Sequence, residues 1–372
     1  MADHAALILP AKRADLVRAA AHDAAPGRGE IAIRARAVAV NPFDRYIQTI
    51  GDVITAYLTY PVVLGTDVAG EVLAIGDGVT RFTVGDRVLG HAAGLEKSRN
   101  SAAEGAFQER VILLEHMASS IPDDMAFADA AVLPLGLSTA ACGLFQEDFL
   151  GLNPPQPDPA PTGEVLLVWG GSTSVGSNAI QLARAAGYAV ITTCSPRNFE
   201  YVRGLGATAA FDYTSRTVVR DIVAAVQGRR CAGAISIGKG SSAGCIDVLS
   251  QCDGKRFVAQ VTPPTSFDQV PAGRGRMRKL VPAMACMIFG TLSLTLRARR
   301  KGVAMKMIWG GSLINNAAGP MIYDAFLPGA LAQGRFVAAP DPLVVGHGLE
   351  HIPHALERQR IGVSACKLVV TL

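Results

Sequence analysis

The sequence has few cysteines, and none of them is paired in a recognisable spacing. The seven cysteines are scattered without any Cys-x-x-Cys, so neither a disulfide framework nor a zinc knuckle is indicated. Charged residues are also scarce, at 18%, and a net charge of +4 is too small to indicate nucleic-acid binding. No basic segment precedes the first short apolar run, because Asp3 comes early. We therefore expect no signal peptide, free thiols in a reducing compartment, and a cytoplasmic location.

Long hydrophobic runs are missing as well. The longest uncharged, mostly apolar stretch, residues 281–296, is short for a membrane span and carries a helix-breaking proline at Pro282. We interpret it as a buried strand with its flanks. What the chain does have is length and apolar content. With 372 residues, 49% of them hydrophobic, it predicts two domains with large cores.

The first part of the chain, to about Pro122, is rich in strand patterns. Residues 30–41 alternate apolar and polar side chains, which predicts a half-buried strand. Residues 62–74 predict a second strand region, bent by its glycines. Turn signals bracket residues 79–84, and the strand pattern continues over residues 87–89. Many short strands with glycine turns favour a barrel-like sheet.

From Phe127 onward the pattern changes to alternating strands and helices. Residues 127–144 predict a helix pair around Pro134, and the proline-rich residues 151–163 predict an exposed connection. The alternation that follows is typical of a doubly wound parallel sheet. Its predicted strands are residues 165–168, 188–193, 209–213, 233–237 and 256–261, its helices are residues 178–186, 198–205 and 218–226, and a helix at 348–359 and a strand at 367–372 end the chain.

The strongest motif is the glycine-rich turn after the strand at residues 165–168. Gly170, Gly171 and Gly176 separate this strand from the helix-forming segment 178–186. Glycines let the backbone approach a phosphate, which the free N–H groups of a helix N-terminus bind. The strand–turn–helix unit predicts a dinucleotide site; the alternative is an ordinary tight turn between strand and helix.

The end of the next strand indicates which dinucleotide would bind. An NAD site carries a carboxylate for the ribose 2′-hydroxyl about 20 residues beyond the glycine turn. Here residues 194–197 are Cys-Ser-Pro-Arg, and no acidic residue occurs before Glu200. Ser195 and Arg197 would instead bind a 2′-phosphate, which favours NADPH. The alternative is that Arg197 is a solvated surface arginine.

These segments, in this order, resemble the medium-chain dehydrogenase/reductase superfamily over nearly the whole chain. Within it, the chain looks like the zinc-free quinone-reductase and enoyl-reductase branch. Residues 192–213 are similar to fungal trans-acting enoyl reductases and to relatives described as zinc-binding alcohol dehydrogenase-like proteins. The supporting segments are AVAVNPFDRYIQ (37–48), PVVLGTDVAGEV (61–72), VGDRVLG (84–90), EGAFQERV (104–111), ADAAVLPLGLSTA (128–140) and KLVVTL (367–372).

The resemblance implies an α/β fold with two domains. Residues 1–126 and 325–372 would form a GroES-like, β-rich catalytic domain. Residues 127–324 would form a Rossmann domain, a doubly wound parallel sheet that binds NADP.

The resemblance also implies a set of site residues. Ser195, Arg197 and Tyr213 would surround the 2′-phosphate, while Asn41 and Thr139 would lie near the nicotinamide. Two departures stand out: Gly171, Thr173 and Ser174 replace an alanine and two glycines of the usual turn, and Cys366 replaces the glycine that commonly precedes the lysine. The remaining implied residues are Gly170, Gly171, Ser172, Thr173, Ser174, Val175 and Gly176 on the pyrophosphate, Ser236, Ile237 and Gly238 near the nicotinamide-side ribose, and Lys367, which either orders the nucleotide side of the cleft or is a surface lysine.

Zinc is not expected. Zinc-binding members of this superfamily carry a cysteine within the segment that here is 41–44 and a histidine within 65–67; both are replaced. Asp67 alone cannot supply the three ligands of a catalytic zinc. Residues 90–105 hold none of the cysteines of a structural zinc lobe, and we expect His91 to be a surface or hydrogen-bonded histidine. Without a Lewis acid, hydride addition to an activated C=C bond is easier than reduction of a plain carbonyl, because hydrogen bonds suffice to stabilise the enolate.

The proton donor stays open between several groups. Some enoyl-reductase relatives place a tyrosine after the Asn-Pro motif, and Tyr46, Tyr57 and Tyr60 are candidates, with Tyr57 preferred. All three are equally compatible with a packing role. The resemblance implies an NADPH-dependent, zinc-independent reductase of an enoyl thioester or enone. The alternatives are a quinone oxidoreductase and a non-catalytic NADPH-binding protein.

Basic residues flank the apolar segment 281–296. They either form a solvated loop or dock a phosphopantetheine arm or an acidic carrier domain. Residues 287–294 could be an edge strand that pairs two copies, so a homodimer and a monomer both stay open. We expect a small-molecule or carrier-bound acyl substrate, no nucleic acid and no membrane partner. The flanking residues are Arg274, Arg276, Arg278, Lys279, Arg297, Arg299, Arg300 and Lys301.

Overall fold

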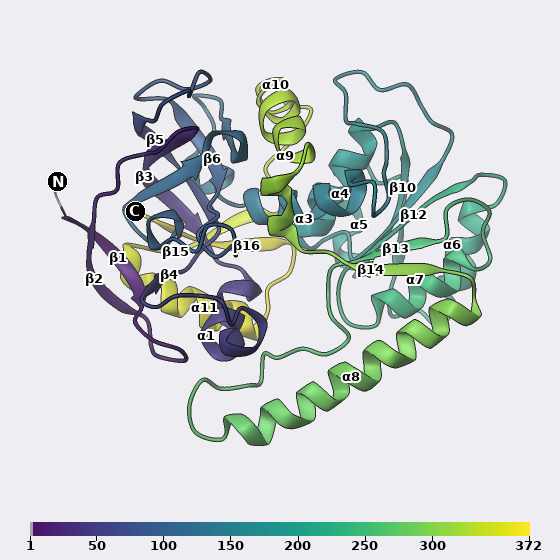
Figure 1. Cartoon of the computed structure of the whole chain (residues 1–372). Coiled ribbons are helices and arrows are strands. Elements are labelled where there is room, and N and C mark those ends of the chain that lie inside the picture. Colours follow the sequence, from purple (N-terminus) through teal and green to yellow (C-terminus); the bar gives the residue numbers. More distant parts are fainter. Residues whose placement is uncertain (1–2) are drawn as a thin grey trace. The chain divides into compact units, whose positions relative to one another are not determined.

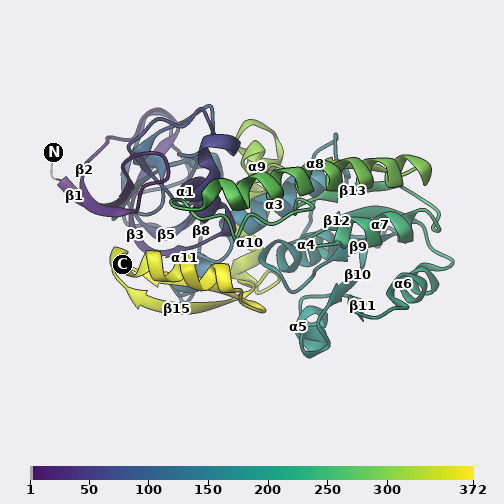
Figure 2. The ribbon, with the colours of Figure 1, turned by 90° about the horizontal axis from the view of Figure 1, so that it is seen from below.

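The computed structural model describes residues 3–372 (Figures 1 and 2). The chain divides into two units and passes from one to the other more than once. Unit 1 consists of Met1–Leu135, Phe267–Lys279 and Tyr323–Leu372, and unit 2 of Gly136–Ser266 and Leu280–Ile322. Each unit has its own sheet.

Unit 1 is built mainly from antiparallel strands. Its larger sheet has the order β15-β16-β3-β5-β6-β8, with β7 also paired to β3, and a smaller sheet has the order β2-β1-β4. The alternating segment predicted as a strand forms β3, whose inward side chains Ile31 and Ile33 are fully buried. The strands are β1 (Asp3–Leu9), β2 (Val17–His22), β3 (Glu30–Ala39), β4 (Val62–Val63), β5 (Asp67–Ile75), β6 (Arg87–His91), β7 (Arg110–Leu114), β8 (Ala118–Ser120), β15 (Asp341–His347) and β16 (Cys366–Thr371).

Two details of unit 1 differ from the sequence prediction. Residues 79–84 form an irregular segment rather than a strand, and the side chain of Asp86 accepts hydrogen bonds from the amide of Thr83 at 2.8 Å and from its hydroxyl at 3.0 Å. Such side-chain bonds compete with strand pairing. An unpredicted helix, α1 (Pro42–Ile54), follows β3. The other helices of unit 1 are α2 (Phe127–Ala130), α10 (Leu327–Ala332) and α11 (Ile352–Ile361).

Unit 2 contains a parallel sheet of six strands in the order β11-β10-β9-β12-β13-β14. The central strands β9 and β12 are buried along their whole length, as expected for a sheet covered on both faces. The predicted doubly wound sheet is confirmed; the predicted strand boundaries shift by one or two residues, and the helix predicted from residue 178 begins at Ser174. The strands are β9 (Val165–Trp169), β10 (Ala189–Cys194), β11 (Ala209–Asp212), β12 (Cys231–Ser236), β13 (Phe257–Gln260) and β14 (Ala304–Met307).

Helices connect the strands of this sheet. Helix α4 packs on β9 and β10, and α7 packs on β12 and β13. Residues 151–163 form the predicted irregular connection, without helix or strand. The helices are α3 (Pro134–Phe145), α4 (Ser174–Ala185), α5 (Phe199–Gly204), α6 (Val218–Val226), α7 (Ser241–Leu249), α8 (Arg276–Arg300) and α9 (Ala318–Pro320).

The apolar segment 281–296 is a helix, not a buried strand. It lies inside α8, which runs without interruption over 25 residues, so the predicted edge strand at 287–294 is also wrong. The prediction relied on apolar content, which does not distinguish a strand from a helix. Alanine, methionine and leucine supply seven of the sixteen residues of the segment and favour the helix. The edge of the sheet is formed by β14 instead.

Candidate functional site

The glycine-rich turn of unit 2 joins β9 to α4. Gly170 has φ +94°, in the left-handed region that favours glycine. Gly171 and Gly176 are required by close packing. A Cβ on Gly171 would lie 2.1 Å from Thr192 Oγ1, and a Cβ on Gly176 would lie 2.2 Å from the carbonyl oxygen of Gly170. The turn is therefore tightly packed, and the first amides of α4 follow it directly.

Thr173 caps the helix that begins at this turn. Its hydroxyl donates to the carbonyl of Gly170 at 2.8 Å and accepts the amide of Gly176 at 3.1 Å. The hydroxyl is thus engaged within the turn. The amides of Ser174 and Val175, at the first two helical positions, have no intrahelical acceptor. These amides suit the pyrophosphate of a dinucleotide.

The turn lies where the strand order of the sheet reverses. β9 is flanked by β10 on one side and β12 on the other, and ligands of open α/β sheets bind at such a switch point. Ile237 follows β12 and donates its amide to Trp169 at the end of β9, at 2.9 Å. Gly238, with φ +95°, donates its amide to Thr262 Oγ1 at 2.9 Å. Ile237 thus lies next to the glycine turn and Gly238 follows it, while their place near the nicotinamide-side ribose stays a prediction.

The residues predicted around a 2′-phosphate follow two neighbouring strands. β10 ends at Cys194, which pairs with Asp212 at the end of β11, so Ser195 and Tyr213 follow paired positions. Arg197 is exposed and forms no ion pair with a carboxylate in the range 3–372. The carboxylate of Asp212, at the end of β11, accepts hydrogen bonds from the amide and hydroxyl of Thr214 at 2.9 and 2.8 Å. The site therefore presents a hydroxyl and a cation at the position where an NAD site presents a carboxylate.

Unit 1 contains a buried ionic cluster around Asp67. The Lys367 ammonium lies 2.5 Å from Asp67 Oδ2, and the Asn41 side-chain amide donates to the same oxygen at 2.7 Å. The amide of Leu135 donates to Asp67 Oδ1 at 2.5 Å, while Lys367 also donates to the carbonyl of Val132 at 3.1 Å. Asp67 is fully buried and Lys367 is 4% exposed. The surface-lysine alternative for Lys367 is therefore wrong.

The hydroxyl of the preferred tyrosine, Tyr57, donates a hydrogen bond within the protein. Tyr57 Oη donates to the carbonyl of Leu95 at 2.9 Å, and burial, with a smaller contribution from Glu96, raises the pKa of Tyr57 to about 12. Tyr46 packs edge-on against Phe267. Of the other residues implied near the nicotinamide, Asn41 belongs to the Asp67 cluster of unit 1, and Thr139 is buried in α3 within unit 2.

Comparison with known proteins establishes the family. Residues 27–123 match the alcohol dehydrogenase GroES-like domain. The chain is 47% identical to the dehydrogenase pigH of Monascus ruber over 98% of both chains. The chain belongs to the medium-chain dehydrogenase/reductase superfamily. This membership confirms the GroES-like domain and the general class of oxidoreductase.

Other members of the superfamily are more distant but informative. The trans-enoyl reductase himH of Aspergillus japonicus is 34% identical over 92% of this chain and 90% of its own. The crystal structure of CurK enoyl reductase matches with a TM-score of 0.70 over 99% of both chains, at 18% identity. This structural match supports the fold. The fold of the medium-chain reductases thus extends over the whole chain.

The Asp67 cluster does not suit the catalytic zinc of the superfamily's zinc-binding members. The two positions that would supply a thiolate and an imidazole are in the segments of Asn41 and Asp67. Asn41 offers Asp67 a donor N–H rather than a free acceptor, and the Lys367 ammonium occupies Asp67 Oδ2. Within residues 3–372 no group of three or more His, Cys, Asp and Glu side chains suited to a metal ion is found. A lysine cation replaces the metal as the charge that neutralises this carboxylate.

Two buried titratable residues beside the cluster have shifted pKa values. Burial raises the pKa of Asp44 from 3.8 to about 7, although its carboxylate accepts the amide of Asn41 at 2.8 Å. Burial lowers the pKa of His91 from 6.5 to about 4, with the nearby Asp67 acting in the opposite direction. His91 is 1% exposed, so the surface alternative is wrong. Sequence analysis missed Asp44; its signal was the helix start Asn41-Pro42-Phe43-Asp44, with a capping asparagine and an aspartate at the third helical position.

These two shifts predict opposite effects of pH on stability. Between about pH 4 and 7 native Asp44 holds a proton that the unfolded chain has lost, so this residue lowers stability as pH rises. Between about pH 4 and 6.5 the unfolded chain protonates His91 while the native protein does not, so this residue raises stability as pH rises. In the wild type the two contributions largely cancel. We expect Asp44→Asn, relative to wild type, to gain stability with rising pH by up to about 1.4 kcal/mol per pH unit.

The matched variant is His91→Gln, which should show the reverse slope. Urea unfolding of both variants and of wild type, followed from about pH 4.5 to 6.5, measures these slopes. Curves that run parallel to the wild type in both variants would show that neither residue has the shifted pKa.

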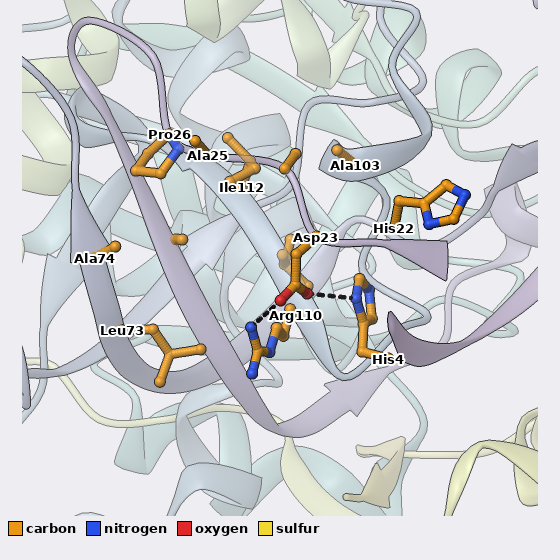
Figure 3. A pocket seen from close by; sticks show the side chains of 13 residues that line it. His4, His22, Asp23, Ala25, Pro26, Leu73, Ala74, Ala103, Arg110 and Ile112 are labelled. Carbon is orange, nitrogen blue, oxygen red and sulfur yellow. Dashed lines mark hydrogen bonds and ion pairs between the residues drawn. The ribbon is translucent and has the colours of Figure 1, made fainter. Parts of the chain in front are cut away.

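A separate pocket of about 280 Å³ lies between the β1–β2 hairpin and strands β5 and β7 of unit 1 (Figure 3). Its charged groups neutralise each other. Asp23 accepts from His4 Nδ1 at 2.9 Å and pairs with Arg110. None of the site residues predicted from the sequence lines it. We therefore assign the pocket no part in the oxidoreductase chemistry.

Proposed function

We propose that this protein is an NADPH-dependent, zinc-independent reductase of activated C=C bonds, acting on an α,β-unsaturated thioester or ketone. The observation that carries the proposal is that both carboxylate oxygens of Asp67 already have partners within the protein. Lys367 and Asn41 bind Oδ2, and the Leu135 amide binds Oδ1. This arrangement disfavours a Lewis acid at the position where zinc-dependent members hold one. Similarity to the trans-enoyl reductase himH supports the same reaction class.

When bound, NADPH would supply the hydride that the proposed reaction adds to the β carbon of the conjugated substrate. The residues of unit 2 fit the rest of that cofactor. The first amides of α4 would bind its pyrophosphate, and Ser195 and Arg197 would bind its 2′-phosphate. No acidic residue follows β10 between Cys194 and Arg197, which favours NADPH over NADH, since a carboxylate there would repel the phosphate. Fungal relatives such as pigH and himH are consistent with a role in secondary metabolism.

The proposal is tested by NADPH oxidation with a 2-enoyl thioester, an enone, a quinone and a saturated aldehyde, each with and without a chelator. We expect turnover of the thioester or enone, slow or no turnover of the aldehyde, and no effect of the chelator. Turnover of the quinone alone would assign the protein to quinone reduction. Tight NADPH binding without turnover of any substrate would indicate a binding protein.

A further inference from the structure

Helix α8 exposes an apolar stripe that nothing in the described chain covers. Val281, Ile288, Leu292 and Leu296 are 56, 61, 53 and 43% exposed, and Phe289 is 70% exposed. The residues from Val281 to Leu296, Phe289 apart, are spaced by seven, four and four positions and therefore lie on one face of the helix. Large exposed apolar patches on a folded protein mark interaction sites.

The stripe faces away from the unit that carries it. Leu280 and Ala298 are buried, and Leu294 packs against the core of unit 2. These three residues are separated by fourteen and then by four positions, so they share one face of the helix, roughly opposite to the stripe. Most surface helices bury their apolar face and expose a polar one. In α8 both faces are apolar, and the 17 residues Leu280–Leu296 contain no charge.

The charge around the stripe has a single sign. Between Asp268 and Asp324 the chain carries nine lysines and arginines and no acidic residue. Four of the basic residues are engaged within the protein: Arg276 with Asp52 at 2.6 Å, Arg297 and Lys301 with Asp247 at 2.5 and 2.7 Å, and Lys306 with Asp148. Five others at the two ends of α8 are exposed and unpaired with carboxylates in the described range 3–372: Arg274, Arg278, Lys279, Arg299 and Arg300.

Each end of α8 contacts a folded part of the chain, which argues against a helix that crosses a membrane. Arg276 is bound to the carbonyl of Thr49 at 3.2 Å as well as to Asp52, and Ala298 is buried just before the return into β14. The uncharged run is also short, at about 26 Å, compared with a hydrocarbon core of about 30 Å. The helix is long and apolar enough by composition to pass as a span, but only 6% of its apolar window is buried in the protein.

We propose that α8 docks lengthwise on an anionic lipid surface. The stripe, about 22 Å long, would enter the boundary between headgroups and acyl chains, and the unpaired cations at both ends would contact anionic headgroups. An acidic protein domain fits the cations but leaves the uncharged centre without a complementary surface, so the observations favour lipid. The inference is independent of the proposed reaction. It replaces our expectation that no membrane is involved.

Vesicle flotation of the full-length protein tests the proposal, with phosphatidylcholine vesicles that contain or lack phosphatidylserine. We expect binding to the anionic vesicles, weakened at least about tenfold without phosphatidylserine or at high salt. Ile288→Ser/Phe289→Ser/Leu292→Ser and, separately, Arg278→Gln/Lys279→Gln/Arg299→Gln/Arg300→Gln should each reduce binding to anionic vesicles by at least about tenfold. The matched control, Val84→Ser/Ile361→Ser, removes apolar side chains that are 65 and 74% exposed elsewhere and should bind like wild type.

Four outcomes would overturn the proposal. The first is wild-type protein that does not float with anionic vesicles. The second is binding that persists in the serine variant of α8. The third is light scattering that shows a dimer for wild type and a monomer for the serine variant without vesicle binding, because the stripe would then be covered by a second copy. Capture of an acidic carrier domain without vesicle binding would likewise assign the face to a protein. Circular dichroism of each variant verifies that it is folded.

Discussion

Replacing Lys367 with methionine should lower the free energy of unfolding by about 3–5 kcal/mol. The ammonium of Lys367 neutralises Asp67, which is completely buried, and contacts it at 2.5 Å. Methionine keeps most of the volume but leaves the carboxylate buried without its cation. Removal of one partner from a buried pair is strongly destabilising because the remaining charge is uncompensated. Urea unfolding of the variant and of wild type at neutral pH measures the difference.

Two further variants separate the ionic effect from the loss of a long side chain. Lys97→Met removes an exposed lysine of the same unit and should change stability by less than about 0.5 kcal/mol. Asp67→Asn/Lys367→Met removes both charges and should be more stable than Lys367→Met alone. A Lys367→Met cost as small as that of Lys97→Met would contradict the buried ion pair.

Arg197→Ala should raise KM for NADPH by about tenfold to a hundredfold and leave KM for NADH nearly unchanged. Arg197 is exposed just beyond β10 and forms no ion pair with a carboxylate of the described residues 3–372. A guanidinium bound to a 2′-phosphate forms charge-assisted hydrogen bonds that NADH cannot offer. Initial rates with each cofactor at a fixed concentration of enone give the two constants.

The control for this variant is Arg220→Ala, on α6 of the same unit. Arg220 is exposed and pairs with the neighbouring Asp221, so its loss should affect neither cofactor. Equal effects of Arg197→Ala on NADPH and NADH would show that Arg197 acts on a part of the cofactor other than the 2′-phosphate. No effect on either would make it the solvated arginine that the sequence also allowed.

The parallel sheet and its glycine turn were predictable because their signals are local. A buried strand, a glycine turn and a helix start occur within Val165–Ala185, and each is set by short-range sterics and hydrogen bonds. The positions of Ile237 and Gly238 beside the turn follow from strand order, which the alternation of elements implied. The hydrogen bond from the Gly176 amide to the Thr173 hydroxyl could also be anticipated from helix capping, since threonine is a preferred cap.

The Asp67 cluster and the exposed helix were not predictable in the same way. Lys367 and Asp67 lie at opposite ends of the chain, and no local pattern indicates that their side chains meet. Helix α8 was mistaken for a strand because an apolar run was assumed to be buried. In the structure this run lies on the surface, so the assumption that it is buried could not indicate whether it forms a helix or a strand. In both cases tertiary contacts, rather than local preference, determine the environment of the residue.

The most direct test of the central claim is the destination of the hydride. We would incubate the protein with a 2-enoyl thioester and NADPH carrying deuterium in the transferable C4 position, and locate the label in the product by NMR. The account predicts deuterium on the β carbon of a saturated thioester, in the presence or absence of a chelator. Deuterium on the carbonyl carbon, or consumption of the cofactor only when zinc is supplied, would contradict it.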